Sequence, residues 1–89
     1  MIRTQVTIVN KLGLHARAAQ KFVACSSAFS CQVRAGKDDQ MVDTISIITV
    51  MMLAAGKGSV LNLELDGADE DAALCALTTL IADRFGEPE

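Results

Sequence analysis

The sequence predicts an α+β protein in which a four-stranded antiparallel sheet carries three helices on one face, in the order β-α-β-β-α-β-α. Three segments alternate polar and apolar residues, which is typical of strands that bury one face only, and a short hairpin adds a fourth strand. Because each strand has a single apolar face, helices can cover the sheet on that face alone. The expected architecture is an open-faced β-sandwich that spans residues 1–89 as one domain.

The first half of the chain predicts a strand, a helix and a hairpin. The first alternating segment ends at a turn that contains Gly13, and apolar residues recur at helical spacing directly after His15. Alternation then resumes, and a polar turn over residues 36–39 leads into a short antiparallel strand. The expected elements are strands at residues 2–8, 29–35 and 40–43 and a helix at residues 16–27.

The second half predicts a short helix, a strand and a longer helix. Ser46 is a favourable N-cap for a helix that Gly56 and Gly58 follow, and leucines at every second position mark the next strand. The acidic residues 69–71 compensate the dipole at the start of the last helix, and residues 87–89 are expected to fray. The expected elements are helices at residues 47–53 and from about 69 to 84 and a strand at residues 60–65.

Composition excludes several classes of function. The formal net charge is −3 and the basic residues are scattered, so binding to nucleic acid or to an anionic membrane is not expected. The three cysteines lack paired spacing and the single histidine cannot complete an ordinary zinc set, so neither a metal nor a cofactor is expected. The N-terminal segment has no signal-peptide pattern. The sequence therefore predicts a cytoplasmic protein whose partners are other proteins.

The only histidine lies where the strand pattern gives way to the first helix. The first turn of a helix leaves backbone NH groups unpaired and carries partial positive charge, so it attracts anions. A neutral imidazole there can attack a phosphoryl group while NH groups and a guanidinium neutralise the phosphoryl oxygens. His15 is therefore the candidate catalytic nucleophile and Arg17 the candidate cation. The candidate phosphate-binding residues are Ala16, Arg17 and Ala18.

Two short motifs stand at a characteristic distance from each other. Residues 11–17 read Lys-Leu-Gly-Leu-His-Ala-Arg, and residues 46–53 read Ser-Ile-Ile-Thr-Val-Met-Met-Leu, followed by Gly-Lys-Gly at residues 56–58. Either motif alone is weak, but both together are specific. With them the whole chain resembles the HPr family, the histidine-containing phosphocarrier proteins of the bacterial phosphoenolpyruvate-dependent phosphotransferase system. The form of both motifs is similar to the nitrogen-related branch of that family, called NPr.

The resemblance implies a relay function for the chain. His15 would accept a phosphoryl group on Nδ1 from phosphorylated enzyme I, with Arg17 at the phosphate, and pass it to an EIIA protein. Such a carrier forms a covalent phosphohistidine but does not turn over a small-molecule substrate by itself, and we expect a monomer.

Of the neighbours Met51 and Met52, helical geometry predicts one buried and one exposed. The partner-docking residues that the resemblance implies are Gln20, Ala24, Ile47, Ile48 and Met51.

Two positions leave alternatives open. Ala18 stands where the family usually has proline, so the helix start loses a fixed φ angle but gains an NH donor. Ser46 is explained equally well as a plain N-cap or as the target of an HPr kinase/phosphorylase. The alternative function is a purely regulatory HPr-like binding module that acts through Ser46 and a patch of Ile47, Ile48 and Met51. Retention of His15 argues against regulation as the sole role.

Overall fold

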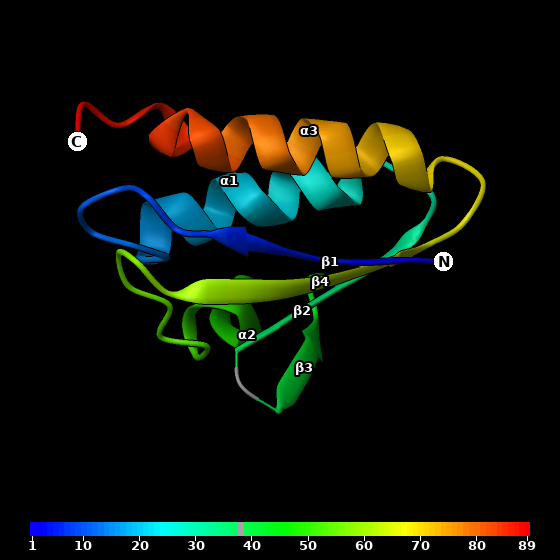
Figure 1. The fold of residues 1–89 in the computed structure, drawn as a ribbon, viewed down its shortest axis with the longest axis horizontal. Helices are drawn as coiled ribbons and strands as arrows, with labels where there is room; N and C mark the ends of the chain where they lie inside the picture. The colour runs from blue at the N-terminus through cyan, green and yellow to red at the C-terminus, as the bar shows by residue number, and fades with distance from the viewer. Residues whose placement is uncertain (38) are drawn as a thin grey trace.

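The computed structural model describes residues 1–37 and 39–89, and its fold confirms the predicted α+β class. One antiparallel sheet has the strand order β1-β4-β2-β3. Helices α1 and α3 lie side by side over the sheet (Figure 1), and α2 packs against α1 and β3. The elements are β1 (Ile2–Thr7), α1 (Ala16–Ser27), β2 (Gln32–Lys37), β3 (Gln40–Asp43), α2 (Ile47–Met51), β4 (Val60–Asp66), α3 (Glu70–Ala82) and a 3-10 turn, η1 (Arg84–Gly86).

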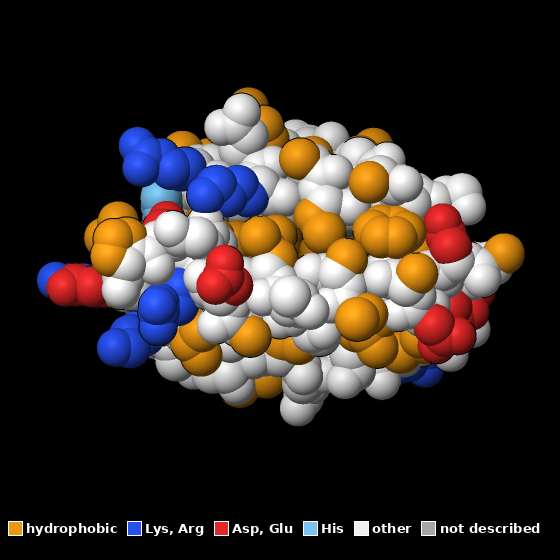
Figure 2. Space-filling model, turned by 90° about the horizontal axis from the view of Figure 1, so that it is seen from above, with side chains coloured by type: hydrophobic (Ala, Val, Ile, Leu, Met, Phe, Trp, Pro, Cys, Tyr) orange, Lys and Arg blue, Asp and Glu red, His pale blue; other side chains and the backbone are white. Residues whose placement is uncertain are grey.

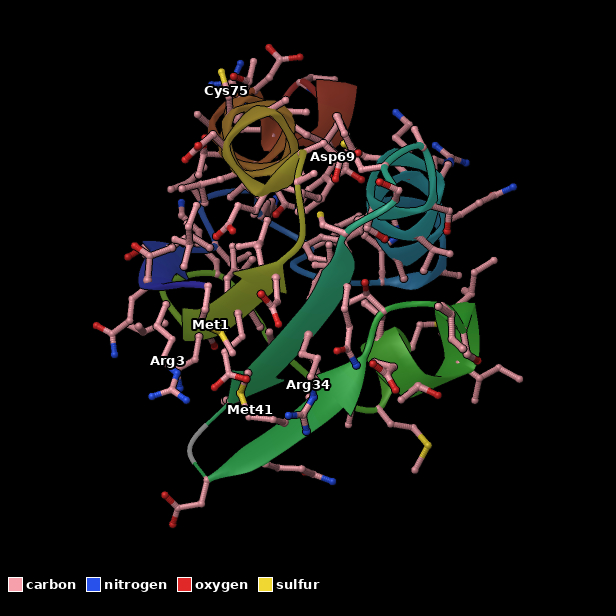
Figure 3. All side chains as sticks on the ribbon, turned by 90° about the vertical axis from the view of Figure 1, so that its right-hand side faces the viewer. Met1, Arg3, Arg34, Met41, Asp69 and Cys75 are labelled. Carbon is pink, nitrogen blue, oxygen red and sulfur yellow. The ribbon has the colours of Figure 1, made fainter. Side chains whose placement is uncertain are left out.

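The hydrophobic core lies between the sheet and the helices. The central strand β4 turns Leu61, Leu63 and Leu65 inward, and each is at most 1% exposed. The polar residues between them face away from the helices, as the period-two pattern predicts. Figure 3 shows Arg3 and Arg34 on that outer side of the sheet, where both form ion pairs with Glu64. The helices contribute Phe22, Val50, Ala73, Leu77 and Ile81 to the core.

The second strand begins at Gln32, three residues later than the predicted start. The backbone NH groups of Ser30 and Cys31 donate to the Asp69 carboxylate, each at 2.8 Å, so they are not free for a strand ladder. Asp69 lies at the start of α3, beside the connection that leads into β2 (Figure 3). Its carboxylate therefore joins two connections instead of only compensating a helix dipole. One residue of the predicted hairpin turn, residue 38, lies outside the described residues.

The turn before the first helix is fixed against the segment that follows α2. Gly13 has a φ of +66°, and a Cβ atom at this position would meet the Ala55 carbonyl oxygen at 2.4 Å, so glycine is required. The backbone NH of Leu14 donates to the same oxygen at 2.8 Å, and the Leu14 side chain is buried. This contact places the residue after Leu14, His15, in a fixed position relative to α2.

Candidate functional site

His15 is the N-cap residue of α1, but its side chain does not cap the helix. Its backbone is extended, with φ −75° and ψ 179°, and its carbonyl oxygen accepts the first helical hydrogen bond, from the NH of Ala19 at 2.8 Å. The imidazole makes no hydrogen bond to the helix NH groups, and its side chain is 28% exposed. The ring is therefore available for chemistry beside the helix end.

Three backbone NH groups at this helix end have no acceptor among the described residues. They belong to Ala16, Arg17 and Ala18, the residues predicted to bind phosphate. The helix begins at Ala16, as expected, although alanine replaces the proline usual at position 18. Since alanine is a strong helix former and the Ala18 methyl group is fully buried, packing replaces the missing ring constraint. The geometry thus offers three donors to an anion beside His15.

Arg17 is exposed on the first turn of α1, and its guanidinium forms no ion pair or hydrogen bond within the described part of the chain. A hollow of about 420 Å³ lies beside it, lined also by Lys11, Leu12 and the C-terminal residues Glu87 to Glu89. Figure 2 shows the histidine side chain at this end of the molecule, among lysine, arginine and acidic side chains. Arg17 is free to turn toward an anion at the helix start.

The predicted fraying of residues 87–89 is wrong, because the C-terminal segment folds back onto the site. The Glu87 carboxylate contacts His15 Nε2 through Oε2, and its Oε1 accepts a hydrogen bond from Asn10 Nδ2 at 2.9 Å. These hydrogen bonds, from Asn10 first and then from His15, lower the pKa of Glu87 below its ordinary value of 4.5. The C terminus lies at the same end of the molecule as the turn before α1 (Figure 1). Sequence reasoning missed Glu87 as a site residue.

The C-terminal segment is anchored by one buried aromatic side chain. Phe85 is fully buried although it has a left-handed backbone, with φ +54°, and its carbonyl oxygen accepts a hydrogen bond from Lys21 Nζ. Further along, the backbone NH of Lys11 donates to the Glu89 carbonyl oxygen at 3.1 Å, and the Lys11 ammonium pairs with the Glu89 carboxylate at 3.3 Å. The signal for this return was Phe85, a large apolar residue between a helix end and a polar tail.

The predicted docking residues form an exposed apolar surface on α2, bordered by α1. Ile47, Ile48 and Met51 are 38%, 69% and 38% exposed, and Gln20 and Ala24 are exposed on α1. Helix α2 packs against α1, and the backbone NH of Leu14, just before His15, donates to the Ala55 carbonyl oxygen in the segment after α2, so α2 and the turn before His15 are neighbours. We use the name docking surface for these five residues.

The expectation that one of the two methionines is buried is wrong. Met52 is 75% exposed and Met51 is 38% exposed. Helix α2 ends at Met51, earlier than predicted, and its inward position is occupied by Val50, which is fully buried. Leu53 then enters the core from the turn that follows. With so short a helix, the core side is filled without either methionine.

Ser46 acts as the N-cap of α2. Its Oγ accepts a hydrogen bond from the backbone NH of Thr49 at 3.5 Å, and the residue is half-buried. This contact supports the capping interpretation. Phosphorylation of Ser46 stays a prediction.

Within residues 1–37 and 39–89, no three His, Cys, Asp or Glu side chains are grouped as a metal site would require. None of the helices in that part of the chain combines the length and apolar character that crossing a bilayer needs. Cys25, Cys31 and Cys75 are free thiols, and burial raises the pKa of the first two.

Comparison with known proteins places these features in a family context. A family model described as "PTS HPr component phosphorylation site" matches residues 2–83. "Phosphocarrier protein HPr" of Pseudomonas aeruginosa is 56% identical over 86 residues, which cover 96% of each chain. "Phosphocarrier protein NPr" of Shewanella violacea is 38% identical over 86 residues, 97% of this chain and 94% of its own. The crystal structure of HPr-C-His from Thermoanaerobacter tengcongensis covers all of both chains with a TM-score of 0.94 and 42% identity.

Proposed function

The chain belongs to the HPr family of phosphocarrier proteins, which relay phosphoryl groups in the phosphotransferase system, and we propose that His15 is the residue through which the phosphoryl group passes. The observation that carries this proposal is the position of His15 at the N-cap of α1, beside three backbone NH groups that have no acceptor within residues 1–37 and 39–89. A phosphoryl group on the ring would meet donors that need no rearrangement.

The transfer step follows from the chemistry of imidazole. The lone pair of Nδ1 attacks the phosphorus atom, a P–N bond forms, and the bond from phosphorus to the donor breaks with its electron pair left on the donor. The NH groups of Ala16, Arg17 and Ala18 and the Arg17 guanidinium neutralise the phosphoryl oxygens. Attack by an acceptor then breaks the P–N bond and restores the free ring.

Family membership implies partners in the phosphotransferase system such as enzyme I and EIIA. We propose that both dock in turn on the docking surface, Gln20, Ala24, Ile47, Ile48 and Met51. Two observations support this: Ile47, Ile48 and Met51 are apolar and exposed, and α2, which carries them, packs against α1. A flexible methionine suits a carrier that must fit two unlike partners. We also propose that the protein is cytoplasmic, because its three free thiols suit a reducing compartment. We propose in addition that it acts as a monomer.

The family branch and Ser46 are the remaining choices. A relative named HPr is 56% identical and a relative named NPr is 38% identical, which favours the HPr type over the nitrogen-related branch. For Ser46 we propose a capping role, supported by its contact with Thr49. A phosphate added there by an HPr kinase/phosphorylase would place about two negative charges beside Ile47 and weaken docking. The purely regulatory alternative has no observation in its favour.

The experiment is phosphorylation in a purified system. The protein is incubated with phosphoenolpyruvate and enzyme I, and the modified residue is located by mass spectrometry under conditions that preserve phosphohistidine. We expect one phosphoryl group on His15 and none in the H15A variant. An unmodified His15, in a reaction where a known carrier is labelled, contradicts the proposal.

A further inference from the structure

The structure gives His15 a carboxylate partner that the relay described above does not require. Glu87 reaches His15 across 72 residues of sequence and contacts Nε2 through Oε2. A carboxylate is an acceptor only, and a neutral imidazole carries a hydrogen on one nitrogen and a lone pair on the other. A lone pair on Nε2 would face the carboxylate lone pairs and repel them. The contact therefore requires the hydrogen on Nε2.

The position of Glu87 is itself fixed by buried groups. Asn10 is fully buried, and its Nδ2 donates to Glu87 Oε1 at 2.9 Å and to the Gly13 carbonyl oxygen at 2.9 Å. Both hydrogens of the amide are thus used, while the buried Asn10 Oδ1 has no partner among the described residues. An amide that leaves its oxygen unpaired to keep both donor contacts is oriented by those two acceptors. Glu87 is consequently held with one oxygen on Asn10 and the other on His15.

The backbone on either side of Glu87 is held in place by contacts of the C-terminal tail with the rest of the protein. The Glu87 side chain is only 11% exposed, and Phe85, two residues before it, is fully buried. Lys21 Nζ donates to the Phe85 carbonyl oxygen, and Arg84 Nε donates to the Glu87 carbonyl oxygen at 3.3 Å. Glu87 is therefore the charged group of the tail that contacts the His15 ring, and Lys21 and Arg84 hold the tail backbone near it.

We propose that Glu87 is a positioning residue that holds neutral His15 as the Nε2–H tautomer and so leaves the Nδ1 lone pair free to accept the phosphoryl group. The hydrogen-bond partner of one ring nitrogen decides which of the two nitrogens carries the hydrogen. In the transfer step no proton has to leave Nδ1, since it bears none. The Nε2 hydrogen stays between the ring and Glu87, whose negative charge balances the positive charge that the ring gains when the P–N bond forms. This inference rests on the proposed role of His15.

A single substitution can reverse the tautomer. In E87Q the side-chain oxygen still accepts from Asn10 Nδ2, so the new NH₂ group points at His15 Nε2. As a donor it favours a lone pair on Nε2 and moves the ring hydrogen to Nδ1. We expect E87Q to accept a phosphoryl group from enzyme I about tenfold to a hundredfold more slowly than the wild type. The expected loss is smaller than for a fully buried histidine, because water can exchange the ring hydrogen of the partly exposed His15.

The matched control is E89Q, which changes a carboxylate in the same tail that pairs with Lys11 and not with His15. Its phosphorylation rate should equal that of the wild type. E87D keeps a carboxylate, which can only accept hydrogen bonds, so it should be phosphorylated faster than E87Q. If the tail had a purely structural role, E87D would have no such advantage over E87Q.

The decisive measurement needs no phosphorylation. Imidazole ¹⁵N chemical shifts, recorded at a pH where the ring is neutral, report which nitrogen carries the hydrogen. We expect hydrogen on Nε2 in the wild type and in E89Q and a shift toward Nδ1 in E87Q. Equal spectra for the wild type and E87Q, or hydrogen on Nδ1 in the wild type, overturn the inference. If instead the spectra follow expectation but His15 is never phosphorylated, the proposed function fails and the tautomer assignment stands.

Discussion

At the scale of single residues, we propose that the Arg17 side chain serves a ligand and not the fold. Its guanidinium has no protein partner among the described residues, so R17A should leave the free energy of unfolding within about 0.5 kcal/mol of the wild type. Phosphoryl transfer to His15 should slow by about tenfold to a hundredfold, because the cation that neutralises the phosphoryl oxygens is lost but an exposed charge is partly screened. Urea unfolding and rapid-quench kinetics measure the two effects. A large loss of stability in R17A would contradict this assignment.

Asp69 is the opposite case, a charged residue that serves the fold. Backbone NH groups of Ser30 and Cys31 donate to its carboxylate and lower its pKa below the ordinary 3.8. The charged form is thus favoured by folding, so the stabilisation is fully present above pH 3.8 and is lost as pH falls through the lower folded value. D69N should lower the urea unfolding midpoint at neutral pH. It should also make the midpoint fall less steeply as the pH is lowered. D71N, on the exposed first turn of the same helix, is the control and should change both much less.

The sequence predicts that Arg17 lies at the start of a helix, but it does not predict the contacts of Asp69, and the difference has a physical reason. His15 and Arg17 belong to one helix start, and a local motif describes their relation completely. The hydrogen bonds of Asp69 are long-range: Cys31 lies 38 positions and Ser30 lies 39 positions before it in the sequence. Such contacts exist only once the sheet and helices have packed. Periodicity along the chain carries no information about them.

At the scale of elements, helix α2 exposes a group of large apolar side chains, Ile47, Ile48 and Met51. Ile48 is 69% exposed, so I48E should cost little stability but should place a charge inside the docking surface. We expect the KM of enzyme I for the protein to rise about tenfold with a smaller change in kcat, since docking and not chemistry is impaired. T79E, an exposed position on α3 away from α2, is the control and should leave KM unchanged. Unchanged KM in I48E would remove α2 from the docking surface.

The elements themselves were predicted to different precision. Helix α1 and the short strand β3 have the predicted bounds, because each is delimited by strong local signals on both sides. The start of β2 and the end of α2 were wrong by two to three residues. In the first case the NH groups were taken by Asp69, and in the second the chain leaves the helix to bury Leu53. Both shifts are made by tertiary contacts that override local preference.

At the scale of the whole molecule, the C-terminal tail joins the functional site to the fold. The return of the tail depends on Phe85, whose side chain is fully buried although the backbone at Arg84 and Phe85 is left-handed. The burial of the aromatic ring helps to offset this strain, which is on the order of 1–3 kcal/mol for each such residue. No short-range pattern predicts that balance, and the contacts of Glu87 span 72 and 77 residues. The tail is therefore the region where prediction from sequence failed most.

Acidification should release this tail before it unfolds the protein. Glu87 has a lowered pKa because Asn10 and His15 donate to its charged form, so its contribution to tail binding is present above pH 4.5 and is lost as pH falls through the lower folded value. The backbone NH of Lys11, which donates to Glu89, reports the attachment. Its hydrogen-exchange protection should fall over that pH range while protection within β4, in the centre of the sheet, persists. In E87Q the Lys11 protection should be lower at neutral pH and nearly independent of acid. Simultaneous loss of protection at Lys11 and in β4 would mean that the tail opens only with the whole fold.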